Sequence, residues 1–73
     1  MGKRKGDIGI GHRMLEELHR MYGTNSSVVK NFGCNYNTMY SWEMGATPGG
    51  AVLAKLHYVG GDVIYVLTWK RGA

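Results

Sequence analysis

Glycines divide this chain into short apolar segments, and that division limits the folds open to it. They recur at Gly23, Gly33, Gly45 and the pair Gly60-Gly61. Glycine ends helices readily because it enters the left-handed region without a steric penalty. Between these glycines, apolar residues recur every three or four positions, the spacing of one helical face. The sequence therefore predicts several short helices.

The first predicted helix, residues 10–22, has the clearest pattern. Its apolar stripe is expected to pack inward, and charged residues are expected to fill the opposite side. The stripe consists of Ile10, Met14, Leu15, Leu18, Met21 and Tyr22, and the charged side of Arg13, Glu16, Glu17 and Arg20.

Two short helices are expected next, joined by a tight turn at Gly33. Thr24 can cap a helix of about residues 25–32, and Asn35 can cap another of about residues 36–44. The residues expected to pack inward are Val28, Val29, Phe32, Cys34, Met39 and Trp42.

Two further helices complete the predicted fold. Thr47-Pro48 is a start signal for the fourth helix, because proline fits the first helical position. Asp62 can cap a fifth helix over "VIYVLT", although its β-branched residues make a strand the competing interpretation. The fourth helix is expected to face inward with Val52, Leu53 and Leu56. The predicted fold is all-α, a compact bundle of five short helices.

The third helix raises a functional question through its outer surface. With Met39 and Trp42 inside, the side chains left pointing outward are Tyr36, Asn37, Tyr40 and Ser41. Two helices joined by a tight turn are the minimum of a helix–turn–helix, whose second helix enters the DNA major groove. An exposed asparagine there can pair with adenine, and tyrosines can reach phosphates or thymine methyl groups. The alternative is an ordinary, half-buried helix surface.

The turn and third helix, "FGCNYNTMYSWEMG", resemble the pattern G-V-S-x-x-T-V-S-x-W-E-x-G of lambda-repressor-like DNA-binding domains. Thr38, Trp42, Glu43 and Gly45 fall on that pattern. The resemblance covers residues 10–71 through "TPGGAVLAKL" and "GGDVIYVLT", and is strongest to the N-terminal domains of phage repressors. It implies a Cro- or CI-type helix–turn–helix domain over residues 10–69, preceded by an arm of residues 1–9 and followed by a tail of residues 70–73.

Site roles also follow from the resemblance. It implies phosphate contacts at Asn25 and Ser26, and a structural acid at Glu43 that pairs with His19 or Arg20 of the first helix. The base-contacting positions that it implies are Tyr36, Asn37, Tyr40 and Ser41. Asn35 is a further expected phosphate contact, and Tyr65 and Trp69 of the fifth helix are expected at a dimer interface. Trp69 stands where the family usually has glycine.

The basic N-terminus is the remaining candidate contact. Lys3, Arg4 and Lys5 either grip DNA phosphates or belong to a solvated, flexible tail. The net charge of +4 and the pI near 9.5 favour an anionic partner, though weakly.

Other classes of function have little support in the sequence. No nucleophile–base pair, paired carboxylates or metal-ligand spacing is present, so neither an enzyme nor a cofactor or metal site is expected. Cys34 is the single cysteine and cannot form an internal disulfide. The apolar run near residues 63–67 is too short to cross a membrane, and the N-terminus does not resemble a secretory signal. A reducing cytoplasm, bacterial or prophage-encoded, is the expected setting.

The leading hypothesis is a sequence-specific transcriptional repressor, or its N-terminal DNA-binding domain, that binds a palindromic operator as a homodimer. An antirepressor, or a C-terminal oligomerisation domain outside this chain, would be further partners. The alternative is a protein-interaction module on the same fold, such as an antitoxin or a regulator's docking domain. The absence of arginine and glutamine from the outer surface of the third helix favours that alternative.

Overall fold

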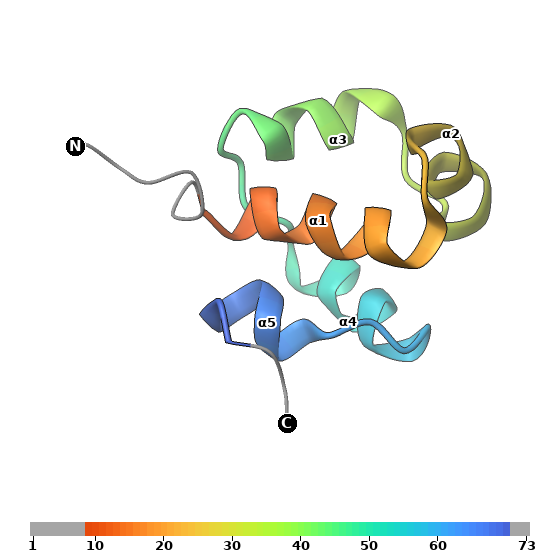
Figure 1. Ribbon diagram of the computed structural model, residues 1–73. Helices are drawn as coiled ribbons and strands as arrows, with labels where there is room; N and C mark the ends of the chain where they lie inside the picture. Colours follow the sequence, from red (N-terminus) through yellow and green to blue (C-terminus); the bar gives the residue numbers. More distant parts are fainter. Residues whose placement is uncertain (1–8, 71–73) are drawn as a thin grey trace.

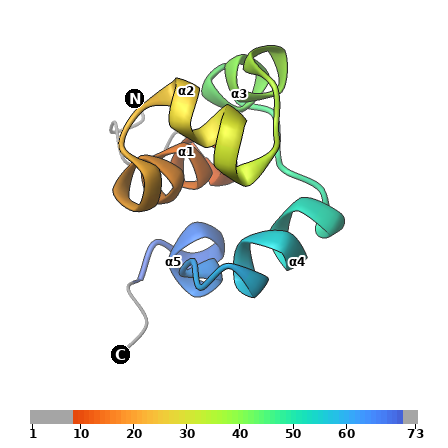
Figure 2. The same cartoon turned by 90° about the vertical axis from the view of Figure 1, so that its right-hand side faces the viewer.

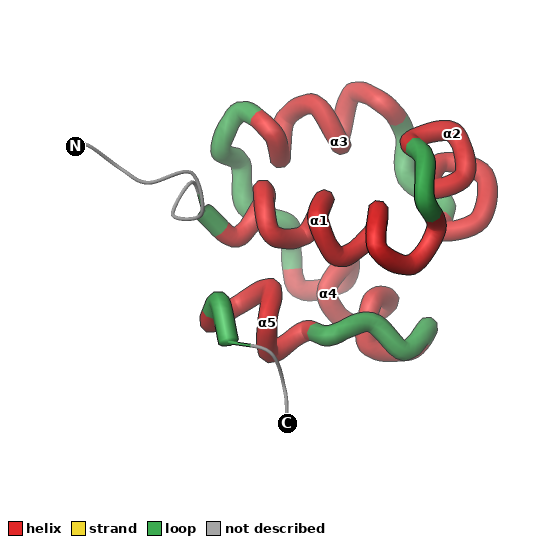
Figure 3. Tube along the Cα trace, in the orientation of Figure 1, coloured by secondary structure: helices red, strands yellow, loops and turns green. Residues whose placement is uncertain are grey.

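The computed structural model describes residues 9–70, which form short helices joined by loops (Figures 1 and 3). In chain order the helices are α1 (Ile10–Tyr22), α2 (Asn25–Ser27) continued by the π-helical segment η2 (Val28–Phe32), α3 (Tyr36–Glu43), α4 (Gly50–Tyr58) and α5 (Val63–Thr68). No β-strand occurs between residues 9 and 70. The prediction of a compact all-α fold with five helices is confirmed, counting α2 and η2 as one.

Helix α1 is the central element of the arrangement. Helix α3 and the α2–η2 segment pack on one side of α1, and α5 packs on another side. Figures 1 and 2 show α1 between these two groups, with α4 beside α5. Helix α3, the α2–η2 segment and α5 are therefore positioned largely by their contacts with α1, whereas α4 packs against α5.

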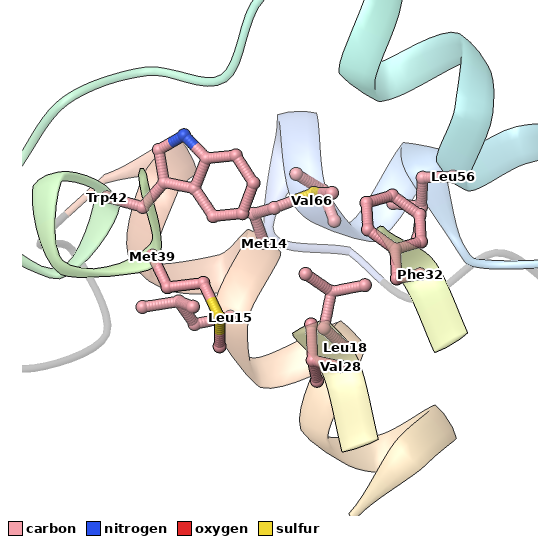
Figure 4. Close-up of a cluster of buried hydrophobic side chains, with 9 residues drawn as sticks. All are labelled: Met14, Leu15, Leu18, Val28, Phe32, Met39, Trp42, Leu56 and Val66. Atoms are coloured by element: carbon pink, nitrogen blue, oxygen red, sulfur yellow. The ribbon is translucent and has the colours of Figure 1, made fainter. Parts of the chain in front are cut away.

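The core joins buried apolar side chains from α1, η2, α3, α4 and α5 (Figure 4). The partly buried Ile10, Met21, Val29, Val52 and Leu53 pack around it, as the apolar stripes predicted. The buried residues themselves are Met14, Leu15, Leu18, Val28, Phe32, Met39, Trp42, Leu56 and Val66. This core is small, so each of its residues carries a large share of the domain's stability.

Three predicted helix caps are confirmed by their hydrogen bonds. The Thr24 hydroxyl accepts from the Ser27 N–H at 3.1 Å, and the Asn35 side chain accepts from the Thr38 N–H at 2.8 Å. Asp62 caps α5, which is a helix and not the competing strand. Such caps satisfy N–H groups that have no partner inside their own helix.

The predicted start of the fourth helix is wrong. Helix α4 begins at Gly50 with Gly49 as its N-cap residue, so Pro48 lies in the preceding loop and not in the first turn. The ring of Pro48 is buried. Burial of that apolar ring against the domain decided its place, which the local start signal could not indicate.

The expected exposure of the charged side of α1 is wrong for Arg13 and Glu17. Both side chains are buried, because α5 packs against this side of α1. The Arg13 Nε–H donates to the carbonyl of Val66 at 2.9 Å, and its guanidinium lies 5.6 Å from the ring centre of Trp69. Arg13 thus holds the end of α5 against α1.

Glu17 connects the same two helices through its carboxylate. It accepts two hydrogen bonds from the Arg20 guanidinium, at 2.9 and 2.6 Å, and one from the Asp62 N–H at 2.8 Å. The hydrogen bonds and charge of Glu17 raise the pKa of Arg20 above its ordinary value. Asp62 in turn accepts from the Tyr65 N–H. One buried carboxylate therefore fixes where α5 starts.

Segment η2 is a feature that the sequence pattern did not indicate. The Gly33 N–H donates to the carbonyl of Val28 at 3.2 Å, five residues earlier, which is the bonding of a π-helix. Gly33 then takes a φ of 92°, a left-handed conformation suited to glycine, and turns the chain toward α3.

Replacing Glu17 should destabilise the domain far more than the same change at an exposed glutamate. Glu17→Gln removes a charged acceptor from a buried site with three hydrogen bonds, so we expect a loss of roughly 2–4 kcal/mol in the free energy of unfolding. Glu43→Gln, on the exposed surface of α3, is the matched control and should change it by less than about 0.5 kcal/mol. Urea unfolding followed by circular dichroism measures both. Equal effects of the two variants would contradict the role given to Glu17.

Cys34, in the turn before α3, should react slowly with thiol reagents. Burial raises the pKa of its thiol, and the nearby charge of Lys55 offsets only part of this effect. Because the thiolate is the reactive form, alkylation at pH 8 should be several-fold slower in the folded protein than in denaturant. Mass spectrometry over time measures the two rates. A folded-state rate above the denatured one would show an activated cysteine instead.

Candidate nucleic-acid interface

The α2–η2 segment and α3 place the sequence-predicted polar residues on the surface. The turn of residues 33–35 joins the two segments, and the Asn35 cap fixes the first turn of α3. Met39 and Trp42 anchor α3 to the core, and Figure 4 shows both side chains at the edge of the buried cluster. With these two residues buried, the opposite face of α3 must point outward.

Three of the four expected base-contacting residues lie on that outward face. Tyr36 and Tyr40 expose 54% and 62% of their surface, and Asn37 is also exposed. Ser41 differs, because it is half-buried and its hydroxyl donates to the carbonyl of Thr38 at 2.7 Å. We therefore assign Tyr36, Asn37 and Tyr40 to one surface, called the α3 face below, with Ser41 at its edge.

The first turn of α2 lies beside the α3 face. Asn25 and Ser26 are exposed there. Asn25, Tyr36 and Tyr40 line one groove of about 240 Å³, together with parts of Leu15, Met39 and Glu43. One predicted phosphate contact, Asn25, and two predicted base contacts, Tyr36 and Tyr40, thus come from different helices to one groove.

The remaining expected phosphate contacts fall into two groups. Asn35 is exposed, but its side-chain oxygen already accepts from the Thr38 N–H, so only its amide group is left to donate to a ligand. Lys3, Arg4 and Lys5 lie outside the described residues.

The expected pairing of Glu43 with the first helix is not what the structure shows. Arg20 pairs with Glu17, and the Nε2 of His19 lies 2.5 Å from the Oδ1 of Asn25. Glu43 is an exposed side chain of α3. Glu17 and Arg20 stand three residues apart on α1, a spacing at which side chains of one helix meet, and the corner between α1 and α2 brings Asn25 to His19. The helical spacing of Glu17 and Arg20 could have indicated the first contact, and no sequence pattern indicated the second.

The described part of the chain is close to neutral in charge, and α3 contributes no positive charge to it. Residues 9–70 hold five arginines and lysines against four acidic side chains, and α3 itself carries Glu43 but no basic residue. Arg13 is hydrogen-bonded to the carbonyl of Val66, and Arg20 is paired with Glu17. The Lys55 ammonium lies over the ring of Phe32 at 5.2 Å. Most of the net charge of +4 therefore comes from residues 1–8 and 71–73.

The two residues expected at a dimer interface make contacts within their own chain. The Tyr65 hydroxyl donates to the carboxylate of Glu16, and the Tyr65 ring packs 6.4 Å from that of Trp69. Trp69 takes a φ of 73° at the end of α5, a conformation that usually selects glycine. The apolar residue of α5 most exposed to solvent is instead Ile64, which lines an apolar groove of about 490 Å³ between α4 and α5.

Two further findings concern the described residues. No group of histidine, cysteine, aspartate or glutamate side chains within residues 9–70 is arranged to hold a metal ion. No helix in this part of the chain is both long and apolar enough to span a bilayer.

Comparison of the chain with protein-family models, with curated proteins and with solved structures finds no match.

Proposed function

We propose that this chain is a sequence-specific DNA-binding protein of the lambda-repressor-like type. The α2–η2 segment would be the first helix of a helix–turn–helix, and α3 its recognition helix. The observation that carries the proposal is the α3 face itself: Tyr36, Asn37 and Tyr40 point outward, beside Asn25 of the neighbouring helix. Polar donors from two helices on one side match how such proteins contact base edges and phosphates together.

The dimensions of α3 suit the major groove. A helix with its side chains is about 10–12 Å across, and the groove is about 12 Å wide. Asn37 would pair bidentately with adenine, a contact worth about 1–3 kcal/mol of discrimination. Tyr36 and Tyr40 would lie over thymine methyl groups or donate to phosphates, and Asn25 would bind a phosphate at the first turn of α2.

Repression would follow from occupying a promoter, without catalysis. The basic residues near the two ends of the chain would attract the DNA backbone. This attraction would depend on salt, because each phosphate that is neutralised releases counterions. A homodimer would present two α3 helices about 34 Å apart and would read an inverted repeat. Tyr65 and Trp69 are proposed at its interface, next to the exposed Ile64 of α5.

A protein-interaction module is the second candidate function. It is favoured by the near-neutral charge of residues 9–70 and by the exposed Glu43 on α3, which would repel a phosphate backbone. The exposed tyrosines would then contact a protein, since tyrosine is enriched at protein interfaces.

Affinity for random-sequence duplex DNA should fall steeply as the salt concentration rises, because the proposed binding depends on contacts between basic residues and phosphates. Fluorescence anisotropy with a labelled random-sequence duplex, repeated over a series of salt concentrations, measures the slope. Binding that ignores salt, or no binding at low salt, would favour the protein-interaction module.

Selection of bound sequences from random duplex should yield a preferred site, and Asn37→Ala should remove the preference for adenine at one step. Bulk affinity at low salt should change little, because Asn37 carries no charge. The matched control is Asn31→Ala, at an exposed asparagine of η2, which should leave the preference intact. An inverted repeat among the selected sites would support the dimer. An unchanged preference in Asn37→Ala would refute its role.

A further inference from the structure

His19 of α1 makes a contact with the candidate interface that no sequence pattern indicated. Its Nε2 lies 2.5 Å from the side-chain oxygen Oδ1 of Asn25. Because an amide oxygen accepts hydrogen bonds, this contact fits the tautomer of His19 that carries its proton on Nε2 and donates it. The two residues stand six positions apart, on either side of the corner between α1 and α2.

This hydrogen bond decides what Asn25 can offer to a ligand. An asparagine side chain has one accepting oxygen and one donating amide group. Because His19 occupies the oxygen, the amide Nδ2 is the group left for an outside partner. A phosphate accepts hydrogen bonds and donates none at neutral pH, so it requires this orientation of Asn25. An unrestrained asparagine would present either end.

The hydrogen bond also restricts the rotamers of the Asn25 side chain before any ligand binds. Asn25 is exposed, and an exposed side chain samples several rotamers that must be frozen when it binds. His19 lies on the last turns of α1, the helix that packs against α3, α5 and η2. The restraint on Asn25 therefore comes from the most firmly held element of the domain.

We propose that His19 is a positioning residue for phosphate recognition, which orients the Asn25 amide toward the DNA backbone. This inference rests on the proposed function. His19 acts through Asn25 and need not contact DNA itself. The cleft around it also holds His12, Glu16 and Glu43, so it is not a basic pocket that would bind phosphate directly.

The test is a double-mutant cycle on DNA affinity, using His19→Ala, Asn25→Ala and the double variant. The probe is a random-sequence duplex at low salt. His19→Ala and Asn25→Ala should each weaken binding about threefold to tenfold, the range expected for one hydrogen bond. In the Asn25→Ala background, His19→Ala should have no further effect. His19→Gln, which keeps a side-chain N–H donor but cannot be protonated, should restore most of the affinity.

A measurement without DNA separates this inference from the proposed function. Nitrogen-15 chemical shifts of the imidazole should show that His19 carries its proton on Nε2 in the free protein. The side-chain amide of Asn25 should populate one rotamer in the wild type and in His19→Gln, and several in His19→Ala. Circular dichroism melting of every variant defines a temperature at which all are folded.

Each outcome has a distinct meaning. An equal loss of affinity from His19→Ala in both backgrounds would show that His19 contacts DNA directly, and no loss from Asn25→Ala would remove the phosphate contact; either overturns the inference while leaving DNA binding standing. If the wild type fails to bind duplex at low salt, the proposed function fails and the positioning role fails with it. The nitrogen-15 data would then identify the His19–Asn25 bond as a purely structural link between α1 and α2.

Discussion

The buried carboxylate of Glu17 is the interaction on which the placement of the second half of the domain depends. A carboxylate is costly to remove from water unless it is paired and hydrogen-bonded, and Glu17 meets that condition through Arg20 and the Asp62 N–H. Apolar contacts alone would bring α5 to α1 without a fixed register, because hydrophobic burial has no direction. The Glu17 carboxylate accepts a hydrogen bond from the backbone N–H of Asp62, so the start of α5 is held at one position on α1.

Helix α1 links this arrangement to the candidate interface. Two of its faces have different tasks: Arg13 and Glu17 hold α5, while Leu15 and Leu18 help to enclose the core beneath η2 and α3. His19 then reaches across the corner to Asn25. Helix α3, with its outward face, thus packs on α1, which is itself held by contacts on several sides. A recognition surface needs such support, because small displacements of its side chains lose hydrogen bonds.

Under the proposed function, the distribution of charge assigns affinity for DNA and preference for a base sequence to different residues. The α3 face consists of uncharged polar and aromatic side chains, which can distinguish bases but attract a polyanion weakly. The excess positive charge lies at the two ends of the chain. Affinity and sequence preference would therefore come from different segments, and should respond separately to salt and to substitution of Asn37.

The sequence by itself determined the helices, three of their caps and nearly all of the core. These features depend on neighbours within about four positions, which the spacing of apolar residues and the caps at Thr24, Asn35 and Asp62 display directly. It also indicated the α3 face, since burial of Met39 and Trp42 leaves only one orientation for that helix. Tertiary structure alone decided the burial of Arg13 and Glu17, the loop position of Pro48 and the contact of His19 with Asn25. Periodicity shows which side of a helix is apolar, but not which other helix will cover its charged side, because that depends on residues as far apart in sequence as Glu17 and Asp62.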